Sequence, residues 1–150
     1  MPSKKKRPKK SIPILYHGTL KKHLKRIEKY GGLKITEGWG GQGTKGVFLS
    51  GSYEAALLWA KIGYMVQVCG EFNPGKFDRL YPGNQAWGKI MILEVKIPQE
   101  FESLLRADME QSEDVGFTGD EYDWRLSLKE IGDVRFDAPI PVSWLTKITP

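Results

Sequence analysis

Apolar residues recur at helical spacing in two segments of the first half of the chain. The first helix is expected to begin at Thr19, as N-cap, and to end at the glycine pair 31–32. The second is expected to run from the N-cap Ser52 to Gly63, with Glu54 in its first turn, where a negative charge suits the helix dipole. The apolar positions of the first helix are Leu20, Leu24, Ile27 and Tyr30.

Short apolar runs bounded by turn residues predict strands along the rest of the chain. The run 90–97 (IMILEVKI), which ends at Pro98, is the clearest of them. Residues 64–69 (YMVQVC) are a further strand candidate, because tyrosine and valine favour strands. The other expected strands are 12–16, 47–49, 134–136 and 144–148, with extended chain at 33–37.

Four segments between these elements carry weaker patterns. Residues 73–88 contain two turn signals, Asn-Pro-Gly and Tyr-Pro-Gly-Asn, and are expected to be mostly loop. Residues 99–106 suggest a helical turn, and the acidic segment 107–120 an exposed loop. The pattern of residues 122–131 fits a helix or a strand equally well.

The order of these elements predicts an α+β domain. The helices occur once near the start instead of alternating with every strand, which argues against a doubly wound parallel sheet. A length of 150 residues suits one domain, and the sequence contains no internal repeat. We therefore expect one domain over residues 12–150, preceded by a disordered basic tail at residues 1–11.

The net charge of +5 belongs to that tail. Residues 1–10 hold six of the 23 lysines and arginines and no acid, which leaves a net charge of −1 on the other 140 residues. Like charges keep such a segment extended, and it could contact nucleic acid or anionic lipid. A tail that only improves solubility is an equally good interpretation.

Composition narrows the classes of protein further. The chain has no apolar run of 18 residues and no signal-peptide pattern, so we expect no membrane span and a cytoplasmic location. Cys69 is the only cysteine, and an internal disulfide needs two. With two histidines beside it, a structural zinc site is not expected.

Three glycines, Gly38, Gly40 and Gly43, match the G-x-G-x-x-G pattern of dinucleotide-binding folds. In those folds the motif follows a strand and opens a helix, whose N-terminus meets the pyrophosphate. Here it leads into a predicted strand. We therefore interpret residues 38–43 as a glycine-rich loop that borders a pocket.

Three other segments together carry a more specific signal. The first is 15–19 (LYHGT), at the end of a predicted strand. The second is 45–50 (KGVFLS), followed by the helical segment 55–60 (AALLWA). The third is 132–136 (GDVRF), which opens a late strand. Each segment alone fits an ordinary structural role, but their order and spacing form a pattern.

This pattern resembles the His–Tyr–Glu branch of the ADP-ribosyltransferase superfamily, which includes poly(ADP-ribose) polymerases and diphtheria-type toxins. Toxins that modify DNA bases and the tRNA 2′-phosphotransferases share the scaffold. The resemblance covers about residues 14–148. It implies split antiparallel β-sheets and two early helices around an NAD cleft. It also implies a transferase that moves ADP-ribose from NAD to a macromolecule and releases nicotinamide, with no metal ion.

The resemblance also assigns roles to individual residues. His17 matches the histidine that bonds a ribose hydroxyl of NAD, and Gly18 the glycine whose backbone holds the nicotinamide carboxamide. Thr19 matches the hydroxyl residue that follows. Phe48 and Trp59 stand where the family has its strand tyrosine and its stacking aromatic residue.

Asp133 stands where the family has its catalytic glutamate, and it is one methylene shorter. Its carboxylate is therefore set back by about 1.5 Å, and misplacement of that size can cost on the order of 100-fold in rate. Three interpretations stay open. The backbone compensates, Glu130 supplies the carboxylate instead, or the protein binds NAD with little or no turnover.

The acceptor of the ADP-ribose is not evident from the sequence. The basic tail favours nucleic acid slightly over protein. Residues 107–125 would hold the acceptor-recognising loop, although Trp124 could equally pack inward; its candidate residues are Glu121, Tyr122, Trp124 and Arg125. Two further alternatives are a relative of the RNA 2′-phosphotransferases, for which only His23 remains as an additional histidine, and a nucleic-acid-binding domain without an NAD site.

Overall fold

The computed structural model describes residues 10–37, 45–111 and 115–148. The glycine motif at 38–43 and most of the basic tail lie outside these residues. The strands are β1 (Leu15–Leu20), β2 (Gly32–Leu33), β3 (Thr36–Glu37), β4 (Lys45–Ser50), β5 (Ile90–Val95), β6 (Leu105–Ala107), β7 (Asp133–Phe136), β8 (Ile140–Pro141) and β9 (Leu145–Ile148). The α-helices are α1 (Leu24–Tyr30), α2 (Tyr53–Cys69), α3 (Pro74–Leu80) and α5 (Trp124–Glu130). The 3₁₀ helices are η1 (Lys21–His23), η2 (Gln85–Lys89), η3 (Gln99–Leu104), η4 (Met109–Gln111) and η5 (Val142–Trp144).

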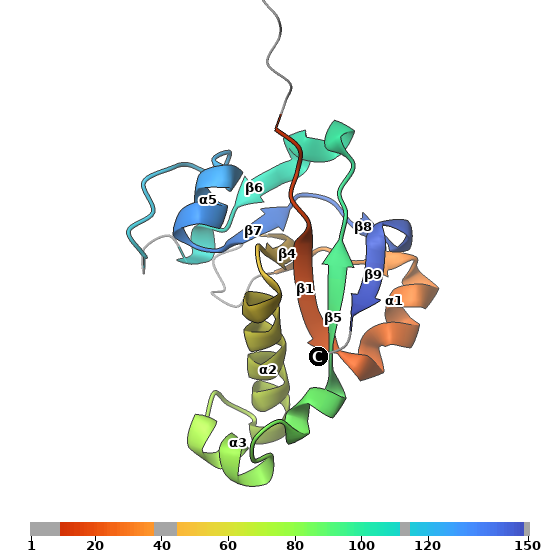
Figure 1. The fold of residues 1–150 in the computed structure, drawn as a ribbon, viewed down its shortest axis with the longest axis vertical. Helices are drawn as coiled ribbons and strands as arrows, with labels where there is room; N and C mark the ends of the chain where they lie inside the picture. Colours follow the sequence, from red (N-terminus) through yellow and green to blue (C-terminus); the bar gives the residue numbers. More distant parts are fainter. Residues whose placement is uncertain (1–9, 38–44, 112–114, 149–150) are drawn as a thin grey trace, which may run out of the picture.

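The strands form an antiparallel sheet in the order β6-β7-β4-β1-β5-β9, with β3 added to β4, and β2 pairs with β8 separately. The α+β class predicted from the sequence is therefore confirmed. Within the described strands, β1 pairs with β5 along its whole length but with β4 only at Tyr16 and Ser50. In Figure 1, β6 and β7 run across the direction of β1 and β5. The sheet thus divides into two halves, which separate along β1 beyond Tyr16.

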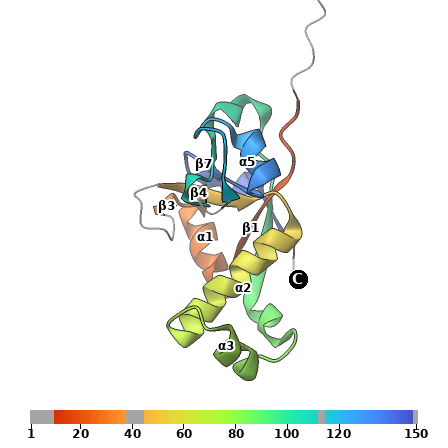
Figure 2. The same ribbon diagram turned by 90° about the vertical axis from the view of Figure 1, so that its left-hand side faces the viewer.

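Strand β5 is buried on both faces, which explains its continuous apolar run. Met91, Leu93 and Val95 belong to the main core, together with Phe136 and Trp124. Their neighbours Ile90 and Ile92 point to the other face, against Ala56 and Ala60 of α2. Because successive side chains of a strand alternate between faces, α1, whose Ile27 joins the main core, and α2 cover opposite faces of this half of the sheet (Figure 2).

The structure confirms two of the predicted helix boundaries and contradicts a third. Ser52 caps α2, and its side chain accepts a hydrogen bond from the backbone N–H of Ala55 at 3.1 Å. Gly31 ends α1 with a φ of 90°, in the left-handed region that glycine adopts easily. Thr19, however, is not an N-cap: it lies within β1 opposite Met91, and α1 begins only at Leu24. Strand pairing with β5 therefore prevails over the capping preference of threonine.

Two predicted elements between α2 and β5 are wrong. Residues 64–69 are helical, because α2 continues past Gly63 and buries Met65 against Phe77 of α3. Residues 73–88 are not mostly loop: they contain α3, in which Asn73 caps the helix and Pro74 occupies its first turn. The Asn-Pro pair is thus a helix start, a role that suits proline because the first helical N–H needs no partner.

The other segments agree more closely with the sequence. Residues 122–131 contain the helix α5, and 99–106 contain η3 followed by the start of β6. The segment 107–120 is less exposed than expected, since Ala107 and Asp108 are buried. Among the described residues, no helix is long and apolar enough to cross a membrane.

Candidate functional site

A pocket of about 850 Å³ opens where the two halves of the sheet separate. Its wall includes β1 from Tyr16 to Leu20, α1 on one side and α2 on the other. This stretch of β1 is an edge that β4 does not cover, and alternate residues of such an edge present backbone N–H and C=O groups. All the site residues expected from the sequence line this pocket: His17, Gly18, Thr19, Phe48, Trp59 and Asp133.

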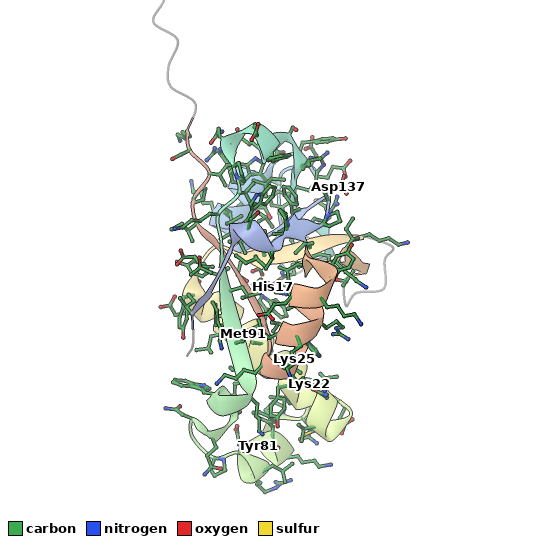
Figure 3. The ribbon with its side chains drawn as sticks, turned by 90° about the vertical axis from the view of Figure 1, so that its right-hand side faces the viewer. His17, Lys22, Lys25, Tyr81, Met91 and Asp137 are labelled. Carbon is green, nitrogen blue, oxygen red and sulfur yellow. The ribbon has the colours of Figure 1, made fainter. Side chains whose placement is uncertain are left out.

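His17 is the central group of β1 in this pocket, and Figure 3 shows it near the middle of the molecule beside α1. Its Nδ1 lies 2.9 Å from the backbone carbonyl of Phe48. A carbonyl only accepts, so Nδ1 carries the proton and Nε2 is left as a hydrogen-bond acceptor. Burial lowers the pKa of His17, and the bond to Phe48 opposes that shift only in part. The imidazole is therefore neutral at neutral pH and suited to accept from a hydroxyl.

Gly18 is required by packing. A Cβ at this position would lie 2.1 Å from the backbone oxygen of Ala56 and 2.9 Å from the Cβ of Ala60. The space that a side chain would need is thus filled by α2. The absent side chain lets α2 approach β1 closely, which brings Trp59 to the pocket.

Asp133 opens β7, and its side chain is almost completely buried, with 6% of the residue exposed. Its Oδ1 accepts a hydrogen bond from Ser50 Oγ at 2.7 Å. Its Oδ2 accepts from the indole Nε1 of Trp59 at 3.1 Å and from Nε2 of Gln111 at 2.8 Å. Three donors from three different elements therefore fix the carboxylate, and Trp59 is tied directly to it.

Two cationic side chains, Arg26 and Lys34, line the α1 side of the same pocket, together with His23. Thr19 Oγ1 lies 3.3 Å from Nδ1 of His23. Burial lowers the pKa of His23, and the charges of Arg26 and Lys22 lower it further. Within the described part of the chain, no carboxylate lies within ion-pair distance of Arg26. This side of the pocket is therefore suited to an anion.

Glu130, the alternative carboxylate, does not reach the pocket. It is exposed at the end of α5 and accepts a hydrogen bond from Thr118 Oγ1 at 3.2 Å. Of the two carboxylates considered from the sequence, the structure therefore places only Asp133 in the pocket.

The residues expected to recognise an acceptor do not line the pocket, and each has a contact within the fold. Trp124 is buried in the core, and Arg125 forms an ion pair with Glu102 at 2.9 Å. Glu121 pairs with Arg135, and Tyr122 lies against the guanidinium of Arg106. The same segment does contribute to the pocket through other residues: Asp108, Glu110 and Gln111.

Sequence reasoning did not identify Ser50, Asp108, Gln111 or Arg26 as site residues. Ser50 could have been found, since it lies two residues after Phe48 and shares its face of β4. Gln111 lies in the short 3₁₀ helix η4 and Asp108 directly precedes it; such a turn has no periodic signal in the sequence.

Among the described residues, no group of three or more metal-binding side chains is present. No protein-family model, curated protein or solved structure significantly matches the chain.

Proposed function

We propose that this protein is an NAD-dependent ADP-ribosyltransferase whose catalytic carboxylate is Asp133. One observation carries the proposal. His17, Phe48, Trp59 and Asp133 lie up to 116 positions apart in the sequence and line one pocket. The split antiparallel sheet and the two early helices beside the pocket also support the ADP-ribosyltransferase fold. A volume of about 850 Å³ falls within the range of pockets that hold cofactor-sized ligands, roughly 300–1,000 Å³.

The chemical groups that line the pocket suit the riboses, the nicotinamide and the pyrophosphate of NAD. His17 offers Nε2 to a ribose hydroxyl, and the exposed edge of β1 around Gly18 offers backbone groups to the nicotinamide carboxamide. The aromatic ring of Trp59 provides a stacking surface. Arg26 and Lys34 would bind the pyrophosphate, because a guanidinium and an ammonium are the side chains that best pair with phosphate.

The reaction breaks the bond between nicotinamide and ribose. Positive charge develops on the ribose as the bond lengthens, as in other glycosidic cleavages. The carboxylate of Asp133 stabilises this charge and can orient an incoming nucleophile. Because Ser50, Trp59 and Gln111 fix the carboxylate before substrate arrives, little reorganisation is needed at the moment of reaction. The same contacts determine where the shorter aspartate side chain lies.

The proposal is tested by incubating the full chain with NAD labelled in its adenylate half, together with DNA, RNA or a protein extract. We expect release of nicotinamide and transfer of label to one acceptor class. Calorimetry with NAD separates the alternatives: binding without nicotinamide release would indicate a non-catalytic NAD-binding module. No binding at all would reject the proposal. Label transfer to nucleic acid or to protein would identify the acceptor class.

Arg26→Ala is expected to weaken binding of both NAD and ADP-ribose by roughly 10- to 150-fold, since a charge-assisted hydrogen bond contributes about 1.5–3 kcal/mol. Binding of nicotinamide alone should not change, because it carries no phosphate. Calorimetry measures all three affinities. The matched control is Lys25→Ala, which removes the adjacent positive charge, on the same helix but outside the pocket (Figure 3). An equal loss in both variants would mean that α1 attracts anions only through its overall charge.

A further inference from the structure

Two buried carboxylates share one amide beside the pocket. Gln111 Nε2 donates to Oδ2 of Asp108 at 2.7 Å and to Oδ2 of Asp133 at 2.8 Å. An amide nitrogen has two hydrogens, so both donors are used. Asp108 is 4% exposed and Asp133 6% exposed. Neither carboxylate can therefore rely on bulk water to stabilise its charge.

A second bridge joins the same two segments through Ser127 of α5. Its hydroxyl donates to the backbone carbonyl of Asp133 at 2.6 Å and accepts from the backbone N–H of Asp108 at 3.1 Å. Ser127 is completely buried. The turn at Asp108 and the start of β7 are thus linked twice: Gln111 bridges the two carboxylates, and Ser127 bridges backbone groups of the two residues. The position of Asp133 consequently depends on that of Asp108.

The charges around Asp108 are mainly negative. Burial raises its pKa above the usual value for an aspartate, and the hydrogen bond from Gln111 opposes the shift. The charges of Asp133 on β7 and of Glu110 in the same turn raise the pKa further. From α5, the neutral hydroxyl of Ser127 accepts a hydrogen bond from the backbone N–H of Asp108. Burial and these like charges thus act on the pKa of Asp108 in the same direction.

We propose that Asp108 is a positioning residue for Asp133: it holds the Gln111 amide against the carboxylate of Asp133, and the Ser127 bridge ties its turn to the start of β7. The link to catalysis rests on the proposed function of Asp133. The coupling of the two carboxylates does not depend on that function, and it can be measured without any turnover.

The indole N–H of Trp59 reports on this coupling, because it donates to the same Oδ2 atom of Asp133 that Gln111 contacts. Its ¹H–¹⁵N resonance, assigned through a Trp59→Phe variant, can be followed in the full chain from acidic to neutral pH. We expect this resonance to shift with pH in the unaltered protein and the shift to be reduced in Asp108→Asn, which keeps the side-chain shape and an oxygen acceptor for Gln111. The control Asp78→Asn removes an exposed carboxylate on α3 and should leave the pH-dependent shift in place.

If Asp108→Asn leaves the Trp59 titration unchanged, the two carboxylates are not coupled and the inference is overturned. Kinetics provide the second readout. Gln111→Ala and Asp108→Leu should each lower kcat for nicotinamide release on the order of 10-fold, with KM little changed, because the carboxylate loses its fixed orientation. Asp108→Asn should stay within about threefold of the unaltered protein, since it preserves the contact with Gln111.

A merely structural role of Asp108, as the acceptor for the backbone N–H of Glu110 in its own turn, makes a different prediction. In that case Asp108→Asn and Asp108→Leu would change melting temperature without changing kcat or the Trp59 resonance. Absence of any turnover in the unaltered protein would reject the proposed function. It would leave the carboxylate coupling to be decided by the spectra alone.

Discussion

Asp133→Asn is expected to reduce nicotinamide release by about 100- to 1,000-fold, the usual effect of removing one preorganised electrostatic contact to a transition state. The loss should fall on kcat, because the negative charge matters most when positive charge develops on the ribose. The dissociation constant for NAD should change by less than about threefold, since binding uses contacts that the substitution does not touch.

The asparagine fits the existing hydrogen bonds, so the result does not merely report unfolding. Its oxygen can face Trp59 and Gln111, which both donate to Oδ2 of Asp133. Its amide nitrogen then faces Ser50, whose hydroxyl can accept as well as donate. Melting temperatures of the two proteins should therefore be similar.

Glu130→Gln is the matched control, because it removes the other carboxylate that the sequence offered. Glu130 lies outside the pocket, and its hydrogen-bond partner is Thr118. We expect unchanged activity. If Glu130→Gln abolished nicotinamide release while Asp133→Asn retained it, the assignment of the catalytic carboxylate would be wrong.

Gly18→Ala is expected to destabilise the protein by about 3 kcal/mol, near the upper end of the usual cost of overpacking. The added Cβ would lie 2.1 Å from a backbone oxygen of α2, and a backbone atom cannot move aside by a change of rotamer. In a chain of this size, such a loss lowers the melting temperature on the order of 10 °C. Thermal unfolding followed by circular dichroism measures it.

The control for this experiment is Gly88→Ala in η2, where an added Cβ meets no atom within 4 Å. Its effect should stay within about 0.5 kcal/mol, as for most surface substitutions. Equal melting temperatures for the two variants would contradict the close approach of α2 to β1. The Gly18→Ala protein that does fold should also show a shifted Trp59 indole resonance, because Trp59 lies on the displaced helix.

Much of the site could be predicted from the sequence. The resemblance singled out His17, Gly18, Thr19, Phe48 and Trp59, and all of them line one pocket. Asp133 could be placed at the start of a strand, since it follows Gly132 and precedes the expected strand 134–136. The hydrogen-bond partners of Asp133 could not be predicted, because Ser50 and Gln111 lie in segments that are distant from it in the sequence.

The choice between Asp133 and Glu130 shows the same limit. The two residues are three positions apart, at the end of a helix and the start of a strand. The local pattern alone allowed either carboxylate to face a pocket. The pairing of β7 with β4 sets Asp133 opposite Ser50 and so places Asp133, not Glu130, in the pocket.

By itself the sequence determined the features that depend on a few neighbouring residues: the cap at Ser52, the helix end at Gly31 and the strand β5. The tertiary structure alone decided that α2 continues to Cys69, that β1 and β4 separate beyond Tyr16, and that Asp108 joins Asp133. Helix capping and the alternation of strand side chains act over a few residues, so neighbouring residues in the sequence determine them. Helix length, strand separation and carboxylate pairing depend on packing between distant segments, and no local pattern encodes that packing.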